Sequence, residues 1–256
     1  MKIRFYANER NARAKAAKRT LAAAAKRLGL SVAATGGADV VIALGGDGTI
    51  LRAVHEFPVI PVLGFNLGSL GFLASVEERD FIPALEALAR GRYRVTERTL
   101  LKIGAHVALN DIVIMREMTG HAAVLDLETD GRSATRYMAD GLIVATPTGS
   151  TAYSLSAGGP VLMPDSGSFV ITPMNPHALA VRPVVVRDTV KLVVTSRRLV
   201  NGGAEKLGVY ADGRRVKALG VGESAVIAKA KTGAKLIELD GYDPYEVMGR
   251  KLGWSK

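Results

Sequence analysis

The chain has 256 residues, of which 48% are hydrophobic, which is enough to bury one large core or two smaller ones. It contains no cysteine, which excludes disulfides, thiolate catalysis and cysteine-ligated zinc and fits a cytoplasmic protein. The net charge of +10 and the pI of about 9.9 are compatible with nucleic acid, anionic lipid or a polyanionic small substrate. No stretch approaches the roughly 18 uninterrupted apolar residues of a membrane span, so we expect no membrane partner.

Much of the positive charge lies in residues 9–27, which contain seven basic residues and one acid. Apolar residues recur there at spacings of three and four, which is typical of a helix that packs by one face and solvates its basic face. A transit peptide has a similar composition. However, residues 2–7 precede the segment with a strand pattern, which places the helix inside a fold. We expect no nucleic-acid partner, because aromatic residues are only 5% and no recognition motif accompanies the helix.

Strand and helix patterns alternate through about residue 95. Such alternation predicts parallel strands joined by crossover helices, and therefore a Rossmann-like α/β domain over residues 1–95. The predicted strands cover residues 3–7, 40–44 and 59–64, and the predicted helices cover the basic segment, 49–56 and 81–89.

The strand at residues 40–44 runs directly into Gly45, Gly46, Asp47, Gly48 and Thr49. Glycines let a backbone turn sharply and approach a ligand closely, and a helix starting after them would direct N–H groups and its positive end at a phosphate. We therefore predict a phosphate-binding loop formed by Gly45, Gly46, Gly48 and Thr49.

Asp47 does not suit such a loop, because phosphate repels a carboxylate. Two functions would explain it, holding a metal ion or accepting a proton from an attacking hydroxyl. The alternative is structural, with Asp47 as the N-cap of the following helix.

After Tyr93 the pattern changes to short runs of aliphatic and β-branched residues separated by turns. This spacing predicts an all-β, sandwich-like domain over residues 96–240. Residues 129–131 and 211–214 are typical hairpin turns. We expect the apolar tail, residues 241–256, to pack back on the first domain. The predicted strands are 100–106, 111–116, 122–128, 142–145, 169–171, 183–186, 190–195, 207–210, 224–228 and 235–239.

A second segment rich in hydroxyl groups and glycines covers residues 138–160. Its strand, residues 142–145, leads into Thr-Pro-Thr-Gly-Ser-Thr at 146–151, where hydroxyl and N–H groups could recognise a base edge or a ribose. A Ser/Thr-rich turn that caps the next helix is the alternative. Tyr153 offers an aromatic face for stacking, or a core side chain.

Taken together, these segments resemble the NAD kinase family over nearly the whole chain. Gly-Gly-Asp-Gly-Thr alone is weak evidence, because phosphofructokinases and lipid kinases of the diacylglycerol kinase type carry related loops. The segment Thr-Pro-Thr-Gly-Ser-Thr-Ala-Tyr is more specific. The matching segments are residues 45–49, 66–73 (Asn-Leu-Gly-Ser-Leu-Gly-Phe-Leu), 109–111 (Leu-Asn-Asp) and 140–160, with 171–177 and 182–183 as further similarities.

The resemblance implies transfer of a phosphoryl group from ATP, or in some members polyphosphate, to the 2′-hydroxyl of the adenosine ribose of NAD. It implies that Asp47 is the base, and that Mg²⁺ arrives mainly with the nucleotide, since no metal-ligand cluster is visible. It also implies a homodimer or homotetramer. The positions that match the family's dinucleotide site are Asp47, Gly48, Arg52, Phe72, Asn110, Asp111, Asp140, Thr148, Thr151, Ala152, Tyr153, Ser154 and Ser156, with His121 as a contact at its rim.

Several positions leave alternatives open. Arg52 could equally be a solvated helix residue, and Arg214 stands where many members have Gln, which puts a ligand role there in doubt. We interpret His55, His106 and His177 as structural. The competing functions are a lipid or sphingoid kinase that shares the loop, and a dinucleotide-binding sensor without catalysis. The sequence does not decide between ATP and polyphosphate as the donor, or between NAD and NADH as the acceptor.

Overall fold

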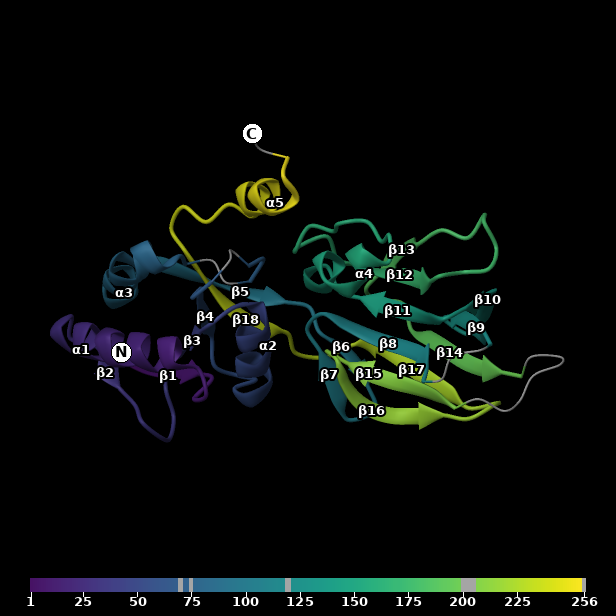
Figure 1. Ribbon diagram of the computed structural model, residues 1–256, viewed down its shortest axis with the longest axis horizontal. Helices are drawn as coiled ribbons and strands as arrows, with labels where there is room; N and C mark the ends of the chain where they lie inside the picture. Colours follow the sequence, from purple (N-terminus) through teal and green to yellow (C-terminus); the bar gives the residue numbers. More distant parts are fainter. Residues whose placement is uncertain (69–70, 74–75, 118–120, 199–205, 255–256) are drawn as a thin grey trace. The chain divides into compact units, whose positions relative to one another are not determined.

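The computed structural model describes residues 1–68, 71–73, 76–117, 121–198 and 206–254. The chain forms two compact units, one made of Met1–Glu97 with Ala234–Lys256 and the other of Arg98–Gly233 (Figure 1). The first is an α/β unit and the second is all-β apart from short helical turns. This confirms the predicted fold class.

A six-stranded sheet forms the centre of the first unit, in the order β2-β1-β3-β4-β18-β5. The pairs β1–β2, β1–β3, β3–β4 and β4–β18 are parallel. The alternating pattern predicted parallel pairing for β1, β3 and β4. The strands are β1 (Lys2–Ala7), β2 (Ser31–Val32), β3 (Val40–Leu44), β4 (Val62–Phe65), β5 (Tyr93–Arg98) and β18 (Ala234–Leu239).

Helices cover both faces of this sheet. Alternate residues of β3 point to opposite faces, and Val40, Ile42 and Leu44 share one core with the buried residues of α1 and α3. Val41 and Ala43 are also fully buried and face the side of α2, which contacts β3 and β4. The helices are α1 (Ala12–Arg27), α2 (Asp47–Glu56), the 3₁₀ turn η1 (Glu78–Asp80), α3 (Phe81–Ala89) and α5 (Pro244–Leu252).

The end of the chain differs from our expectation. We predicted residues 235–239 as a strand of the β domain, but β18 lies between β4 and β5 in the parallel sheet. A short apolar run has the same pattern in either sheet, so the pattern could not choose between them. The tail after β18 forms α5 and contacts the first unit through an ion pair between Arg250 and Glu77.

The second unit contains two six-stranded antiparallel sheets, in the orders β10-β9-β14-β17-β6-β7 and β13-β12-β11-β8-β15-β16. Their facing side chains form one core, with Leu125 and Val194 from the first sheet and Ile114 and Val144 from the second. The strands are β6 (Leu101–Ile103), β7 (His106–Ala108), β8 (Asp111–Arg116), β9 (Ala123–Thr129), β10 (Arg132–Ala139), β11 (Gly141–Ala145), β12 (Ser168–Met174), β13 (Val184–Arg187), β14 (Leu192–Arg197), β15 (Leu207–Ala211), β16 (Arg214–Leu219) and β17 (Ser224–Lys229).

The outer face of the second sheet carries a smaller core, which positions the segment after β11. Val113, Ile143 and Met174 point to this face and pack with Leu162 and Ala157. The segment contains the 3₁₀ turn η2 (Thr148–Thr151) and the short helix α4 (Tyr153–Ser156).

Both predicted hairpin turns are confirmed. Asp130 and Gly131 have φ of 50° and 77°, and Asp212 and Gly213 have φ of 48° and 73°, which is the conformation of a type I′ turn. They join β9 to β10 and β15 to β16. No described helix is long and apolar enough to cross a membrane.

Candidate functional site

The turn after β3 is closed tightly by glycine. The Gly45 N–H donates to the Phe65 carbonyl at 2.8 Å. A Cβ at Gly45 would lie 2.3 Å from Thr49 Oγ1, and φ there is +155°, so the position requires glycine. Gly46 and Gly48 are exposed, and no atom lies within 4 Å of their Cβ positions. At Gly46 and Gly48 the turn therefore exposes backbone without side chains at the N-terminus of α2, where an anion is favoured.

Asp47 is the first residue of α2, and its carboxylate is bound to the loop that follows β4. The N-cap is Gly46 and no side chain caps this helix, so the alternative in which Asp47 is the N-cap is wrong. Its two oxygens accept hydrogen bonds from the N–H groups of Phe72 at 2.8 Å and Leu73 at 3.0 Å. A Cβ on Gly71 would lie 2.0 Å from Asp47 Oδ1, so glycine permits this approach. Two backbone donors thus fix the orientation of the carboxylate.

This loop is anchored beside β4. Val76 forms a β-bridge with Phe65, and its N–H donates to the Gly64 carbonyl at 3.2 Å. Its own carbonyl accepts the Asn66 N–H at 2.8 Å. The Asn66 side chain accepts the Gly68 N–H at 2.9 Å. The chain therefore leaves β4 at Asn66 and returns to it at Val76.

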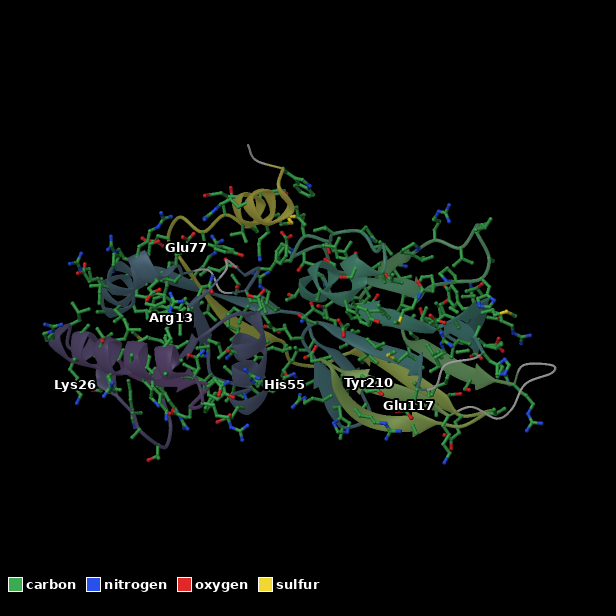
Figure 2. The ribbon with its side chains drawn as sticks, in the orientation of Figure 1. Arg13, Lys26, His55, Glu77, Glu117 and Tyr210 are labelled. Carbon is green, nitrogen blue, oxygen red and sulfur yellow. The ribbon has the colours of Figure 1, made fainter. Side chains whose placement is uncertain are left out.

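Arg52 lies on the exposed side of α2. Burial and the nearby Glu56 raise the pKa of Tyr6 in β1, and the positive charge of Arg52 opposes them. Arg52 is therefore close to Glu56 and Tyr6. His55, which precedes Glu56 in the last turn of α2, is half-buried (Figure 2).

In the second unit, Asn110 and Asp111 lie at the start of β8 and are held by Asp212. The Asp212 carboxylate accepts the N–H groups of Leu109 and Asn110 at 2.8 Å and of Asp111 at 3.2 Å. The Asp212 N–H donates to the Asp111 carbonyl at 3.0 Å. The sequence predicted the turn that contains Asp212 but not this role. No local signal reveals it, because its partners lie more than 100 residues away.

The segment after β11 packs against the same place. The Thr146 hydroxyl donates to the Leu109 carbonyl at 2.5 Å, and the Thr146 N–H donates to the Asn110 carbonyl at 2.9 Å. A Cβ on Gly149 would lie 2.0 Å from the Asn110 carbonyl oxygen, so the two backbones are in direct contact. Residues 109–111, 146–149 and 212 therefore form one hydrogen-bonded cluster, which we call the Asp212 cluster.

The predicted residues between Thr148 and Ser156 differ in exposure. Tyr153 and Ser156 are exposed, and Thr148, Thr151 and Ala152 are half-buried. Their side chains can therefore meet a ligand at the surface of this unit.

Ser154 differs from its neighbours and from our expectation. It is fully buried, and its hydroxyl is hydrogen-bonded to the Thr172 hydroxyl at 2.8 Å. A Cβ at Gly159 would lie 2.3 Å from Ser154 Oγ. These contacts attach α4 to the sheet, so Ser154 supports the segment from within. Because this stretch is rich in hydroxyl groups, the sequence did not show which serine the short helix would turn inward.

Asp140 lies apart from the Asp212 cluster. It precedes β11 and Thr146 follows that strand, so the six-residue step between them spans about 20 Å. Asp140 forms an ion pair with Arg116 at 2.8 Å and accepts a hydrogen bond from Asn175 at 2.9 Å. Asn175 and then Arg116 hold the pKa of Asp140 below its usual range. Exposed His121 contacts Arg116 through its backbone carbonyl.

Asp111 is the most strongly perturbed acid of the cluster. It is 6% exposed. Burial, with a smaller effect of the neighbouring Asp212 carboxylate, raises its pKa from 3.8 to about 7. Near neutral pH this carboxyl therefore exchanges between a neutral form, which can donate a hydrogen bond, and an ionised form.

The sequence-predicted residues thus fall into two groups. Gly45 to Thr49, Arg52 and Phe72 belong to the first unit, and all the others belong to the second. Arg214 is exposed in β16. Among the described residues no group of three or more His, Asp or Glu side chains could hold a metal ion.

Comparisons with known proteins match both units. The family model of the ATP-NAD kinase N-terminal domain matches residues 4–93, and that of the ATP-NAD kinase C-terminal domain matches residues 109–239. An NAD kinase of Geotalea daltonii is 40% identical over 231 residues, which cover 86% of this chain and 80% of that protein.

Two solved structures have the same fold. An NAD kinase of Archaeoglobus fulgidus in complex with ATP has a TM-score of 0.82 and 26% identity, with 99% of each chain covered. A yeast NADH kinase complexed with NADH has a TM-score of 0.88 over 100% of this chain and 88% of that one, at 24% identity.

Proposed function

This chain belongs to the NAD kinase family and is a phosphotransferase that forms NADP from NAD, and from that premise we propose how its residues divide the reaction. The first unit supplies the base and binds the phosphates of the donor. The second unit recognises the adenosine half of NAD, whose ribose 2′-hydroxyl accepts the phosphoryl group.

Asp47 is the proposed base, and its hydrogen bonds carry the proposal. Its Oδ2 accepts the Phe72 N–H and its Oδ1 accepts the Leu73 N–H, so the backbone fixes the direction in which the carboxylate points. A carboxylate oxygen can accept more than one hydrogen bond, and an alcohol O–H is a suitable donor to it. As the hydroxyl oxygen bonds to the terminal phosphorus of ATP, the bond from that phosphorus to the bridging oxygen breaks, ADP leaves, and the hydroxyl proton passes to Asp47.

The glycine turn is the proposed site for the donor phosphates. Gly46 and Gly48 are exposed and have no atoms near their Cβ positions, so a phosphate group can approach the backbone at the N-terminus of α2. ATP is the donor in the matched family. Polyphosphate carries the same phosphoanhydride chemistry, and we include it as an alternative donor.

A divalent cation, Mg²⁺ in our proposal, arrives with the nucleotide. The described residues contain no cluster for a resident ion, and Asp47 is the only carboxylate at the turn. This donor set suits Mg²⁺ that is held mainly by phosphates. When bound, the ion offsets phosphate charge.

Asn110 and Asp111 are the proposed contacts for the ribose, and the exposed or half-buried residues Thr148, Thr151, Ala152, Tyr153 and Ser156 are those for the adenine end. The Asp212 cluster supports this assignment, because it holds Asn110 beside the segment that starts at Thr146. Arg52, His121 and Asp140 are further proposed contacts. We also propose that the chain forms a homodimer or homotetramer and that it is cytoplasmic. Sedimentation of the purified chain tests the oligomeric state.

The test is whether the purified protein forms NADP from NAD and ATP with Mg²⁺. Polyphosphate then replaces ATP as the donor, and NADH replaces NAD as the acceptor. Asp47→Asn keeps the size of the side chain but removes the base, so kcat should fall by about 10²- to 10⁴-fold. Asp39→Asn is the matched control, because Asp39 directly precedes β3, accepts the Lys2 N–H at 2.7 Å and lies outside the turn. Near-full activity of Asp47→Asn would remove the base assignment. Tight NAD binding with no turnover of any donor would favour a sensor.

A further inference from the structure

The C-terminal helix α5 contacts the segment that orients Asp47. We call residues 71–73 with 76 and 77 the support segment. Arg250 Nη2 lies 2.5 Å from Glu77 Oε1. The Lys251 ammonium lies 5.7 Å from the centre of the Phe72 ring, within the range of a cation–π contact. Both contacts lie within the first unit.

The support segment is held from two sides. Its Phe72 and Leu73 N–H groups bind Asp47. A side chain at Gly71 would collide with the Asp47 carboxylate. Glu77 follows Val76, where the segment returns to β4. The pair with Arg250 lowers the pKa of Glu77 and raises that of Arg250, chiefly through their hydrogen bond. The contacts of α5 therefore act on the same backbone that fixes the carboxylate.

We propose that Arg250 and Lys251 are positioning residues for phosphoryl transfer, and that they act through the support segment to keep the Asp47 carboxylate oriented. Neither residue needs to contact a substrate for this role. The inference rests on the proposed function of Asp47 for its kinetic consequence, but its structural consequence can be measured without catalysis.

The first measurement is hydrogen exchange at the amides of Phe72 and Leu73 in the full chain. Arg250→Ala and Glu77→Gln should each speed exchange at both amides about fivefold, because a surface ion pair is worth up to about that factor. The exchanged pair Glu77→Arg with Arg250→Glu should restore the slow rate. Lys251→Ala should act mainly on Phe72.

The chain offers a matched control. Arg13 of α1 lies 2.5 Å from Glu78, the residue next to Glu77, so the pair joins α1 to the same stretch. Arg13 and Glu77 are labelled in Figure 2. Arg13→Ala removes an ion pair of the same length but has no link to α5, so exchange at Phe72 and Leu73 should stay unchanged. Equal acceleration in Arg13→Ala, or unchanged exchange in Arg250→Ala and Glu77→Gln, overturns the proposal.

The second measurement is steady-state kinetics. Arg250→Ala should lower kcat about fivefold while KM for NAD changes less than twofold, and the exchanged pair should recover kcat. If Asp47→Asn retains full activity, the base assignment fails, and the exchange measurement still decides whether α5 positions the carboxylate. A folded Arg250→Ala with faster exchange and unchanged kcat would overturn the catalytic part. Because Arg250 is 43% exposed, loss of folding is not expected, and Glu77→Gln provides the same test.

Discussion

Asp47 in the first unit and Asp212 in the second both use a carboxylate to bind backbone N–H groups. Each carboxylate binds backbone N–H groups of a distant segment: Asp47 binds those of Phe72 and Leu73, and Asp212 binds those of residues 109–111. Asp47 stands beside an open turn of exposed glycines. Asp212 stands beside a second carboxyl, Asp111, that is buried.

This difference separates two uses of a bound carboxylate. At Asp47 the hydrogen bonds orient a group beside a surface that a ligand can reach. At Asp212 they join strands that are far apart in sequence, and the charge disfavours ionisation of Asp111. We therefore expect changes at Asp47 to act mainly on catalysis, and changes around Asp212 to act mainly on stability.

The largest expected effect concerns Asp111 and pH. Because folding raises its pKa from 3.8 to about 7, the stability it contributes is fully present below about pH 4 and is lost as pH rises through 7. The loss should be roughly 4 kcal/mol, since each pKa unit corresponds to about 1.4 kcal/mol. Asp111→Asn removes this dependence, so the variant should gain about that amount relative to the wild type between pH 4 and 8.

Urea unfolding of both proteins across this pH range measures the difference. Asp165→Asn is the control, because Asp165 is exposed in the same unit. Parallel stability curves for the wild type and Asp111→Asn would contradict a carboxyl that is buried and raised in pKa.

The next effect is expected for Asp212→Asn. The amide group replaces one acceptor oxygen with a donor that faces backbone N–H groups, so the unfolding free energy should fall by about 3 kcal/mol. Asp47→Asn should cost about 1–2 kcal/mol, because its donors Phe72 and Leu73 are half-buried, whereas Leu109 and Asp111 are buried. Urea midpoints at pH 7 compare the two variants. Equal losses would mean that both carboxylates serve the same structural purpose.

The sequence predicted the helices and strands that have a strong local pattern of apolar residues. The strand at residues 40–44 and the helix at residues 81–89 match β3 and α3, because continuous burial and a 3.6-residue stripe are local signals. The strands β2, β5, β10 and β16 were not predicted, because β2 has only two residues and at least half of the residues of the other three are exposed. The predicted strand at 59–64 lies instead at Val62–Phe65, and Val59 is 73% exposed.

The candidate site could be predicted from the sequence only where its functional residues are neighbours in the chain. The glycines around Asp47 form such a signal. The role of Asp212 depends on partners more than 100 residues away, and the inward rotation of Ser154 depends on Thr172 in β12. Both follow from tertiary packing, which a short pattern does not contain.

Two glycines at equally close contacts sharpen the comparison. A Cβ at Gly149 would lie 2.0 Å from the Asn110 carbonyl oxygen, which is backbone and cannot move alone. Gly149→Ala should therefore cost about 2–3 kcal/mol of stability, as overpacking does. Thermal unfolding measures it against Gly220→Ala, where the nearest atom would be 3.6 Å away. A loss no greater than that of Gly220→Ala would show that the two backbones are not in firm contact.

The smallest effect on stability is expected for Gly71→Ala, because its Cβ would meet the end of a side chain, Asp47 Oδ1, at 2.0 Å. The carboxylate can rotate away, so the protein should fold with a loss of about 1–2 kcal/mol, as expected for Asp47→Asn, which disturbs the same hydrogen bonds. The rotation breaks the hydrogen bonds that orient Asp47, and kcat should fall about tenfold. Gly68→Ala, with no atom within 4 Å of its Cβ position, is the control for both measurements. A stability loss in Gly71→Ala as large as that in Gly149→Ala, with kcat unchanged, would place Asp47 in the same structural class as Asp212.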